Sequence, residues 1–333
     1  MPIGHRKLAV CVLFALSADT LRALEPSQAT IQNPAPAAPA MEEVEVTGVR
    51  PGPGLWRVSR GDHVLWLLGT LDPLPRKMVW RSTEVESVMA QAQEVLYDQP
   101  SVSVHGNPFT WITAYFRWRH VQTMPGETTL KDWIGPDLYA RFAALEARFD
   151  AHDRRTERLR PVFAALRLYG RALDASYLTP GNQTEEAVLK LARRHGVAVQ
   201  RPQVSVDDPE ALIAQLGEVS RDAHASCLAA VVDRLESGLE PMKVAARAWA
   251  VGDVETLRQL PHPQDIEVCT DVVAAAPRMK ALIGQTASGW DREFAGALEH
   301  NRTTLAMRPI YDLLGPDGLL AKLRLEGYQV EGP

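Results

Sequence analysis

The 333-residue sequence has few cysteines and no excess of basic residues. It contains three cysteines, and its 36 lysines and arginines are outnumbered by 41 aspartates and glutamates, for a formal net charge of −5. This balance argues against nucleic acid as a partner, because nothing in it attracts phosphate backbones. The common catalytic signatures HExxH, GxSxG, GxGxxG, CxxC and the Walker loop are missing. The easiest enzyme classes are therefore excluded.

Long hydrophobic runs are also missing. The longest covers residues 8–16, about half of the roughly 20 residues that a membrane-spanning helix needs. Basic His5, Arg6 and Lys7 precede it and small residues follow it, an order typical of a signal peptide, which we place at residues 1–23. We therefore expect an exported protein, periplasmic or secreted, with no membrane span in the mature chain.

Residues 24–54 are rich in Pro, Ala and Gly and poor in large apolar side chains, which predicts a linker. Residues 55–333 remain for one folded domain. Alternating apolar residues predict a β-hairpin over residues 55–68, and a helix and a third strand follow up to residue 97. A helix and a short strand end the chain after residue 318.

The middle of the domain, roughly residues 105–260, follows the 3.6-residue period of helices almost throughout. We therefore predict an α/β (α+β) fold, in which a small mixed β-sheet is flanked by helices and carries a large helical insert.

Two cysteines, Cys227 and Cys269, remain after removal of the signal peptide. In an oxidising compartment such a pair predicts a disulfide bond. Two buried thiols or one nucleophilic cysteine are the alternatives, although no histidine lies at a useful spacing from either cysteine.

One stretch of the insert is rich in large apolar side chains around Arg117 and Arg119. A helix that binds a membrane surface or a peptide is one interpretation. Because these side chains fall on all sides of the helix, we expect it to be buried between other helices. They are Phe109, Trp111, Ile112, Tyr115, Phe116 and Trp118.

Four groups of residues carry a resemblance to a known family. The second strand ends in Gly69-Thr70-Leu71-Asp72, the third ends in Asp98, and a helix ends in Trp249-Ala250-Val251-Gly252-Asp253. The last group lies at residues 315–328. These motifs resemble the TraB/GumN family, which is related to the Tiki metallopeptidases. In that family a strand ends in Gly-Thr-x-His, and the histidine is a metal ligand.

The chain departs from the family pattern at the positions that matter for chemistry. Asp72 and Asp312 stand where the family has histidines, and Asp98 stands where it has glutamate. The family's Arg-Asn pair reads His300-Asn301 here. Carboxylates in place of imidazoles favour harder cations, such as Mn²⁺, Mg²⁺ or Ca²⁺.

The resemblance implies peptide processing or peptide binding. Because the histidines are replaced, we expect a non-catalytic member without a cofactor, which binds a peptide or protein partner. The alternative is a divalent-metal-dependent, peptidase-like hydrolase with Asp72, Asp98 and Asp312 as metal ligands and Asn301 or His300 orienting the substrate. A purely structural envelope protein also fits, because each aspartate can serve in a turn or cap and Gly69-Thr70 forms a tight strand exit with or without a ligand.

Overall fold

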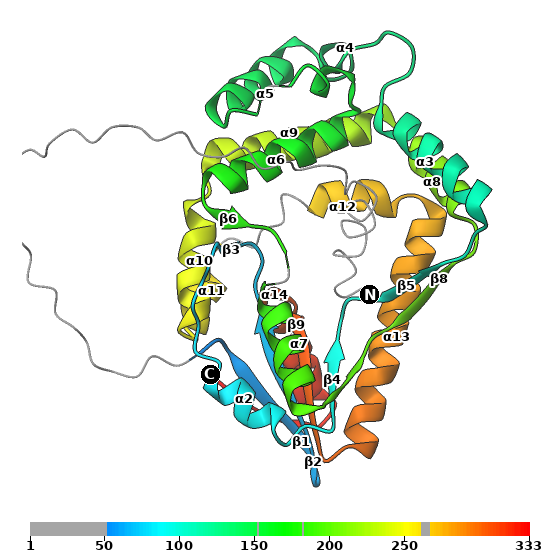
Figure 1. The fold of residues 1–333 in the computed structure, drawn as a ribbon. Helices are drawn as coiled ribbons and strands as arrows, with labels where there is room; N and C mark the ends of the chain where they lie inside the picture. The colour runs from blue at the N-terminus through cyan, green and yellow to red at the C-terminus, as the bar shows by residue number, and fades with distance from the viewer. Residues whose placement is uncertain (1–51, 152, 182, 261–266) are drawn as a thin grey trace, which may run out of the picture.

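The computed structural model describes residues 52–151, 153–181, 183–260 and 267–333. The predicted signal peptide and nearly all of the predicted linker, residues 1–51, lie outside the described residues. Helices and a mixed β-sheet make up the described chain, as predicted (Figure 1). In this part of the chain, no helix combines the length and the hydropathy that a membrane crossing requires.

The main sheet has six strands in the order β10-β1-β2-β9-β4-β7. Strands β2, β9, β4 and β7 run parallel, whereas β1 pairs antiparallel with both β2 and β10. The strands are β1 (Leu55–Arg60), β2 (His63–Thr70), β4 (Glu94–Tyr97), β7 (Ala198–Gln200), β9 (Thr303–Pro309) and β10 (Gln329–Glu331).

The predicted hairpin is confirmed in β1 and β2, where Arg60 pairs with His63 across a turn that contains Gly61. Gly61 has a φ of +62°, which glycine adopts without a steric penalty. Alternate residues of β2 then point to opposite faces of the sheet. Leu65 and Leu67 are buried on one face and Leu68 on the other, so helices cover both faces.

Two groups of helices cover the sheet (Figure 1). The face that carries Leu68 packs against α2 (Thr83–Met89) and α7 (Gln183–His195). The face that carries Leu65 packs against a larger group, whose longest member supplies Trp290, Phe294 and Leu298. That group consists of α10 (Glu240–Ala250), α11 (Val254–Gln259), α13 (Pro277–His300), α14 (Ile310–Leu313) and α15 (Leu319–Leu325).

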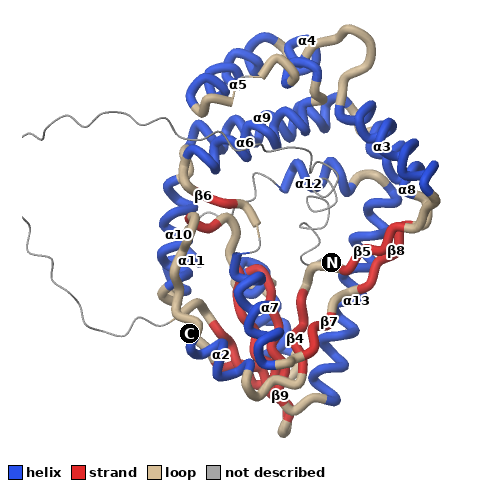
Figure 2. Tube along the Cα trace, in the orientation of Figure 1, coloured by secondary structure: helices blue, strands red, loops and turns tan. Residues whose placement is uncertain are grey.

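The remaining helices form a second region with its own core, away from the main sheet (Figures 1 and 2). They are α3 (Pro108–Gln122), α4 (Leu130–Ile134), α5 (Pro136–Arg148), the 3₁₀ turn η1 (Thr156–Arg158), α6 (Pro161–Ala175), α8 (Pro209–Gly217), α9 (Arg221–Ser237) and α12 (Glu267–Ala274). Two short strand pairs join this region to the sheet: β3 (Leu74–Pro75) with β6 (Leu178–Thr179), and β5 (Ser101–Val104) with β8 (Gln203–Val206).

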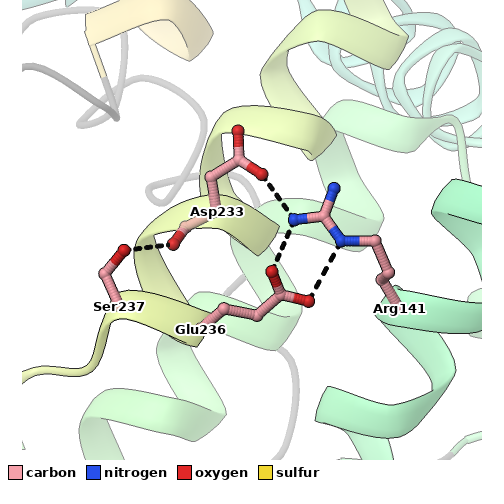
Figure 3. A network of polar contacts seen from close by, with 4 residues as sticks. All are labelled: Arg141, Asp233, Glu236 and Ser237. Atoms are coloured by element: carbon pink, nitrogen blue, oxygen red, sulfur yellow. Dashed lines mark hydrogen bonds and ion pairs between the residues drawn. The ribbon is translucent and has the colours of Figure 1, made fainter.

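Helix α9 is linked to α12 by a disulfide bond and to α5 by hydrogen bonds. The predicted pairing of Cys227 with Cys269 is present, with a sulfur–sulfur distance of 2.06 Å, and it joins α9 to α12. On α5, Arg141 donates hydrogen bonds to Asp233 and Glu236 of α9 (Figure 3). The hydrogen bonds that Arg141 donates to Glu236 lower the pKa of the Glu236 carboxyl.

The prediction that the aromatic stretch is buried is wrong. The stretch forms α3, but only one stripe of it, Ala114, Trp118 and Val121, is buried against the helical region. A single stripe suffices because α3 lies at the rim of that region rather than between two layers (Figure 2). The remaining large side chains are exposed, among them Phe109 at 78% and Phe116 at 65%.

Candidate functional site

The carboxyl ends of three parallel strands lie side by side at one edge of the main sheet. Thr70 at the end of β2 pairs with Pro309 at the end of β9, and Tyr97 at the end of β4 pairs with Met307 of β9. Ligands of parallel sheets bind outside such strand ends. Asp72, Asp98 and Asp312 each follow one of these ends within three residues. The structure therefore brings the segments of the three predicted aspartates to one edge.

Asp72 is partly buried between the sheet and the helical region. Its carboxylate accepts a hydrogen bond of 2.8 Å from the backbone N–H of Gly181. It also lines a small cavity together with Arg234, Met242 and Tyr311. Burial raises the pKa of the Tyr311 hydroxyl.

A buried arginine lies at the centre of this edge. Arg308 is 6% exposed, and its Nε is 3.5 Å from the carboxylate of Asp312, four residues later. Its guanidinium stacks on the ring of Trp290 at 5.1 Å. Asp98 directly follows Tyr97, whose partner Met307 directly precedes Arg308. The guanidinium of Arg308 therefore places a positive charge at these strand ends.

Asn301 and His300 lie at the opposite edge of the sheet, before β9 begins. The Asn301 carbonyl lies 2.8 Å from Nδ1 of His63, the first residue of β2. The seven residues of β9, which extend over about 20 Å, separate them from Asp312. The structure does not bring these two residues together with the three aspartates, and a role in orienting a substrate there does not fit this placement.

Asn301 instead joins the starts of two strands. Its amide donates to Glu94 at the start of β4, at 2.5 Å, and to the hydroxyl of Thr304, at 3.2 Å. Burial raises the pKa of the Glu94 carboxyl, and the hydrogen bond from Asn301 acts against this rise. This contact holds β4 and β9 in register.

The Gly-Thr motif and the Trp-x-x-x-Asp helix end are in direct contact. The indole of Trp249, which is fully buried, donates a hydrogen bond of 2.8 Å to the carbonyl of Gly69. A Cβ at position 69 would lie 2.9 Å from the side chain of Ile310, which explains the glycine. Thr70 is 2% exposed, and its hydroxyl has no hydrogen-bond partner among the described residues.

A groove that sequence reasoning missed lies next to this contact. It has a volume of about 770 Å³ and runs between residues 78–81 and helices α10 and α11. Trp80 forms part of its wall and packs edge-on against Trp249, with the ring centroids 5.8 Å apart. The neighbouring Val79 is 90% exposed. In the sequence, the only signal for this groove was the adjacent pair of bulky apolar residues, Val79 and Trp80.

The grouping of side chains at the strand ends bears on the predicted metal site. Across the described ranges, no three His, Cys, Asp or Glu side chains are grouped so that they hold a metal. Arg308 lies beside the carboxylate of Asp312, which a bound cation would need as a ligand. The three-aspartate metal site therefore stays a prediction, which metal analysis will test.

Comparison with known proteins agrees with the motifs. The sequence model of the TraB/PrgY/gumN family matches residues 54–332. No curated protein and no solved structure matches the chain. Since the match covers the whole main sheet and the helical region, the chain belongs to the TraB/PrgY/gumN family.

Proposed function

We propose that this chain is an exported, non-catalytic member of its family that binds a peptide or protein partner. The observation that carries the proposal is the buried guanidinium of Arg308 among the strand ends. It neutralises the carboxylate of Asp312 without a metal.

The electrostatic reason is direct. A divalent cation bound by Asp312 would lie within a few ångströms of Arg308, and like charges at that distance repel strongly away from solvent. The stacking of Arg308 on Trp290 and its buried position keep the guanidinium from moving aside. Catalysis by the metal-dependent route of the hydrolase alternative would require this ion pair to separate.

The apolar groove suits the partner. Met78, Val79 and Trp80 line one side, and Val244, Ala248 and Val251 line the other. Arg81 and Arg247 bring guanidinium groups to the groove, where Arg247 also pairs with Glu240 at 3.2 Å. Asp253 and Thr256, which are hydrogen-bonded to each other, are the polar groups of the lining. Mostly apolar linings with a few polar groups are typical of ligand-binding sites, and hydrophobic grooves also receive the apolar side chains of peptides. The partner we propose is a peptide segment with a large apolar side chain and a neighbouring carboxylate.

A peptide-array screen of the purified mature protein tests the binding. We expect enrichment of such peptides over scrambled sequences, and its loss in Val79→Asp, which places a charge in the groove. Leu325→Asp is the matched control, because Leu325 is equally exposed, at 89%, but lies on α15 away from the groove. Equal enrichment in both variants, or none in the wild type, would refute the proposed groove.

Metal analysis separates the proposal from the hydrolase alternative. We expect the purified protein to contain no stoichiometric metal and to melt at the same temperature with Mn²⁺, with Ca²⁺ and with chelator. Hydrolysis of a peptide that stops on chelation and in Asp72→Asn would establish the alternative instead.

A further inference from the structure

Helix α3 presents a broad apolar surface to solvent, which the proposed function does not use. Five large side chains of this helix are at least 44% exposed. They are Phe109 (78%), Trp111 (44%), Ile112 (54%), Tyr115 (46%) and Phe116 (65%). Clusters of this kind on a soluble protein mark a place of interaction.

The other sides of α3 are already in contact with the protein. The stripe of Ala114, Trp118 and Val121 packs into the helical region. The next side faces α8, where Glu210 accepts a hydrogen bond from Thr113 and pairs with Arg117 at 3.3 Å. At 100° per residue, Ile112, Phe116 and Phe109 fall opposite the buried stripe. These three residues form the outward face of the helix.

The charge of α3 is one-sided. Its sequence contains no aspartate or glutamate, and beside Arg117, which pairs with Glu210, it carries Arg119 and His120. Arg119 and His120 are exposed near the end of the helix, next to Tyr115 and Phe116. A helix with an apolar face and basic neighbours is complementary to an anionic surface with an apolar interior.

We propose that α3 docks on the surface of an anionic lipid bilayer. Phe109, Ile112 and Phe116 enter the boundary between headgroups and acyl chains. Trp111 and Tyr115 lie at headgroup level, as amphipathic rings do at membrane interfaces, and Arg119 contacts lipid phosphates. The position of α3 at the outer rim of the molecule, away from the main sheet, leaves room for a flat surface (Figure 1).

The association is peripheral. The helix has 15 residues and buries one side against the protein, so it lies along the surface rather than across the bilayer. The groove on α10 and α11 shares no residue with α3, so docking and the binding of a partner are independent.

Vesicle co-sedimentation of the purified protein tests this docking. We expect binding to vesicles of phosphatidylcholine with phosphatidylglycerol, weakening as salt is raised, and little binding to pure phosphatidylcholine. The double variant Phe109→Ser, Phe116→Ser should bind at least about tenfold more weakly, because two rings no longer enter the lipid. Arg119→Glu should lose the preference for anionic lipid.

The matched control is Tyr177→Ser, Leu325→Ser, which removes two other exposed apolar side chains, 74% and 89% exposed, outside α3. It should bind like the wild type, and circular dichroism should show both double variants folded. Absence of vesicle binding by the wild type, or an equal loss in the control, would overturn the proposal. A dimer that the α3 variant abolishes, without vesicle binding, would assign the face to a second copy of the chain.

Discussion

Two buried tryptophans allow one substitution to be compared in opposite environments. Trp249 is fully buried and donates its indole N–H to the Gly69 carbonyl at 2.8 Å. Trp118 is 3% exposed, and its indole N–H has no hydrogen-bond partner among the described residues. Replacement of either by Phe removes a similar apolar volume, so the cavity terms largely cancel in the comparison.

The polar terms do not cancel. Trp249→Phe leaves a buried carbonyl without its donor, which costs roughly 1 to 3 kcal/mol, whereas Trp118→Phe removes an unsatisfied donor and regains about as much. We expect the free energy of unfolding of Trp249→Phe to be about 2 to 6 kcal/mol below that of Trp118→Phe. Urea unfolding followed by far-UV circular dichroism measures both. Equal losses would refute the hydrogen-bond reasoning.

Three further predictions concern stability. Replacing Cys227 and Cys269 by Ala should lower the free energy of unfolding in urea by about 4 kcal/mol, because their bond closes a 42-residue loop. Burial of His224, followed by the charge of Arg160, lowers its pKa from 6.5 to about 4. As the pH falls, this histidine takes up a proton in the unfolded chain before it does so in the folded chain. The free energy of unfolding of the wild type should therefore fall by about 3 kcal/mol relative to that of His224→Leu between pH 6.5 and 4, measured by unfolding at each pH. Parallel curves of the two proteins against pH would contradict this. Arg308→Met should lower the free energy of unfolding in the same assay by about 3 kcal/mol, since it leaves Asp312 beside an uncharged neighbour. The control Arg194→Met breaks only an exposed pair with Glu86, and it should lower this free energy by under about 1 kcal/mol.

Local patterns predicted the start of the fold well. The hairpin of β1 and β2 follows from alternating apolar residues on either side of a glycine turn. Helices such as α6 and α9 follow from the 3.6-residue period, because each buries one face in the helical region. In these segments the local preference and the tertiary packing agree.

The central strand β9 and the long helix α13 were not predicted. α13 carries three glycines in its interior, Gly284, Gly289 and Gly296, which weaken a local helix signal. β9 is buried on both sides and contains Arg308, so it shows neither clear alternation nor a purely apolar run. Tertiary packing, rather than local preference, decides both elements.

The missed strand also changes where two residues of the candidate site lie. The resemblance to the family grouped His300 and Asn301 with the three aspartates, as residues that orient the substrate. The segment between Asn301 and Asp312 is extended, so it carries Asp312 to the other edge of the sheet. Arg308 was missed for the same reason, since only the strand reveals that it points into the protein.

The sheet order has a consequence for how the chain is made. The central strand β9 comes from residues 303–309, and the edge strand β10 from the last few residues. A ribosome releases β2 long before β9, with residues 71–302 between them. Until then the apolar faces of Leu65, Leu67 and Leu68 lack their central partner, so the nascent hairpin needs a chaperone or the helical region to shield it. A chain truncated before residue 303 would lack β9 and β10, so it could not complete the six-stranded sheet.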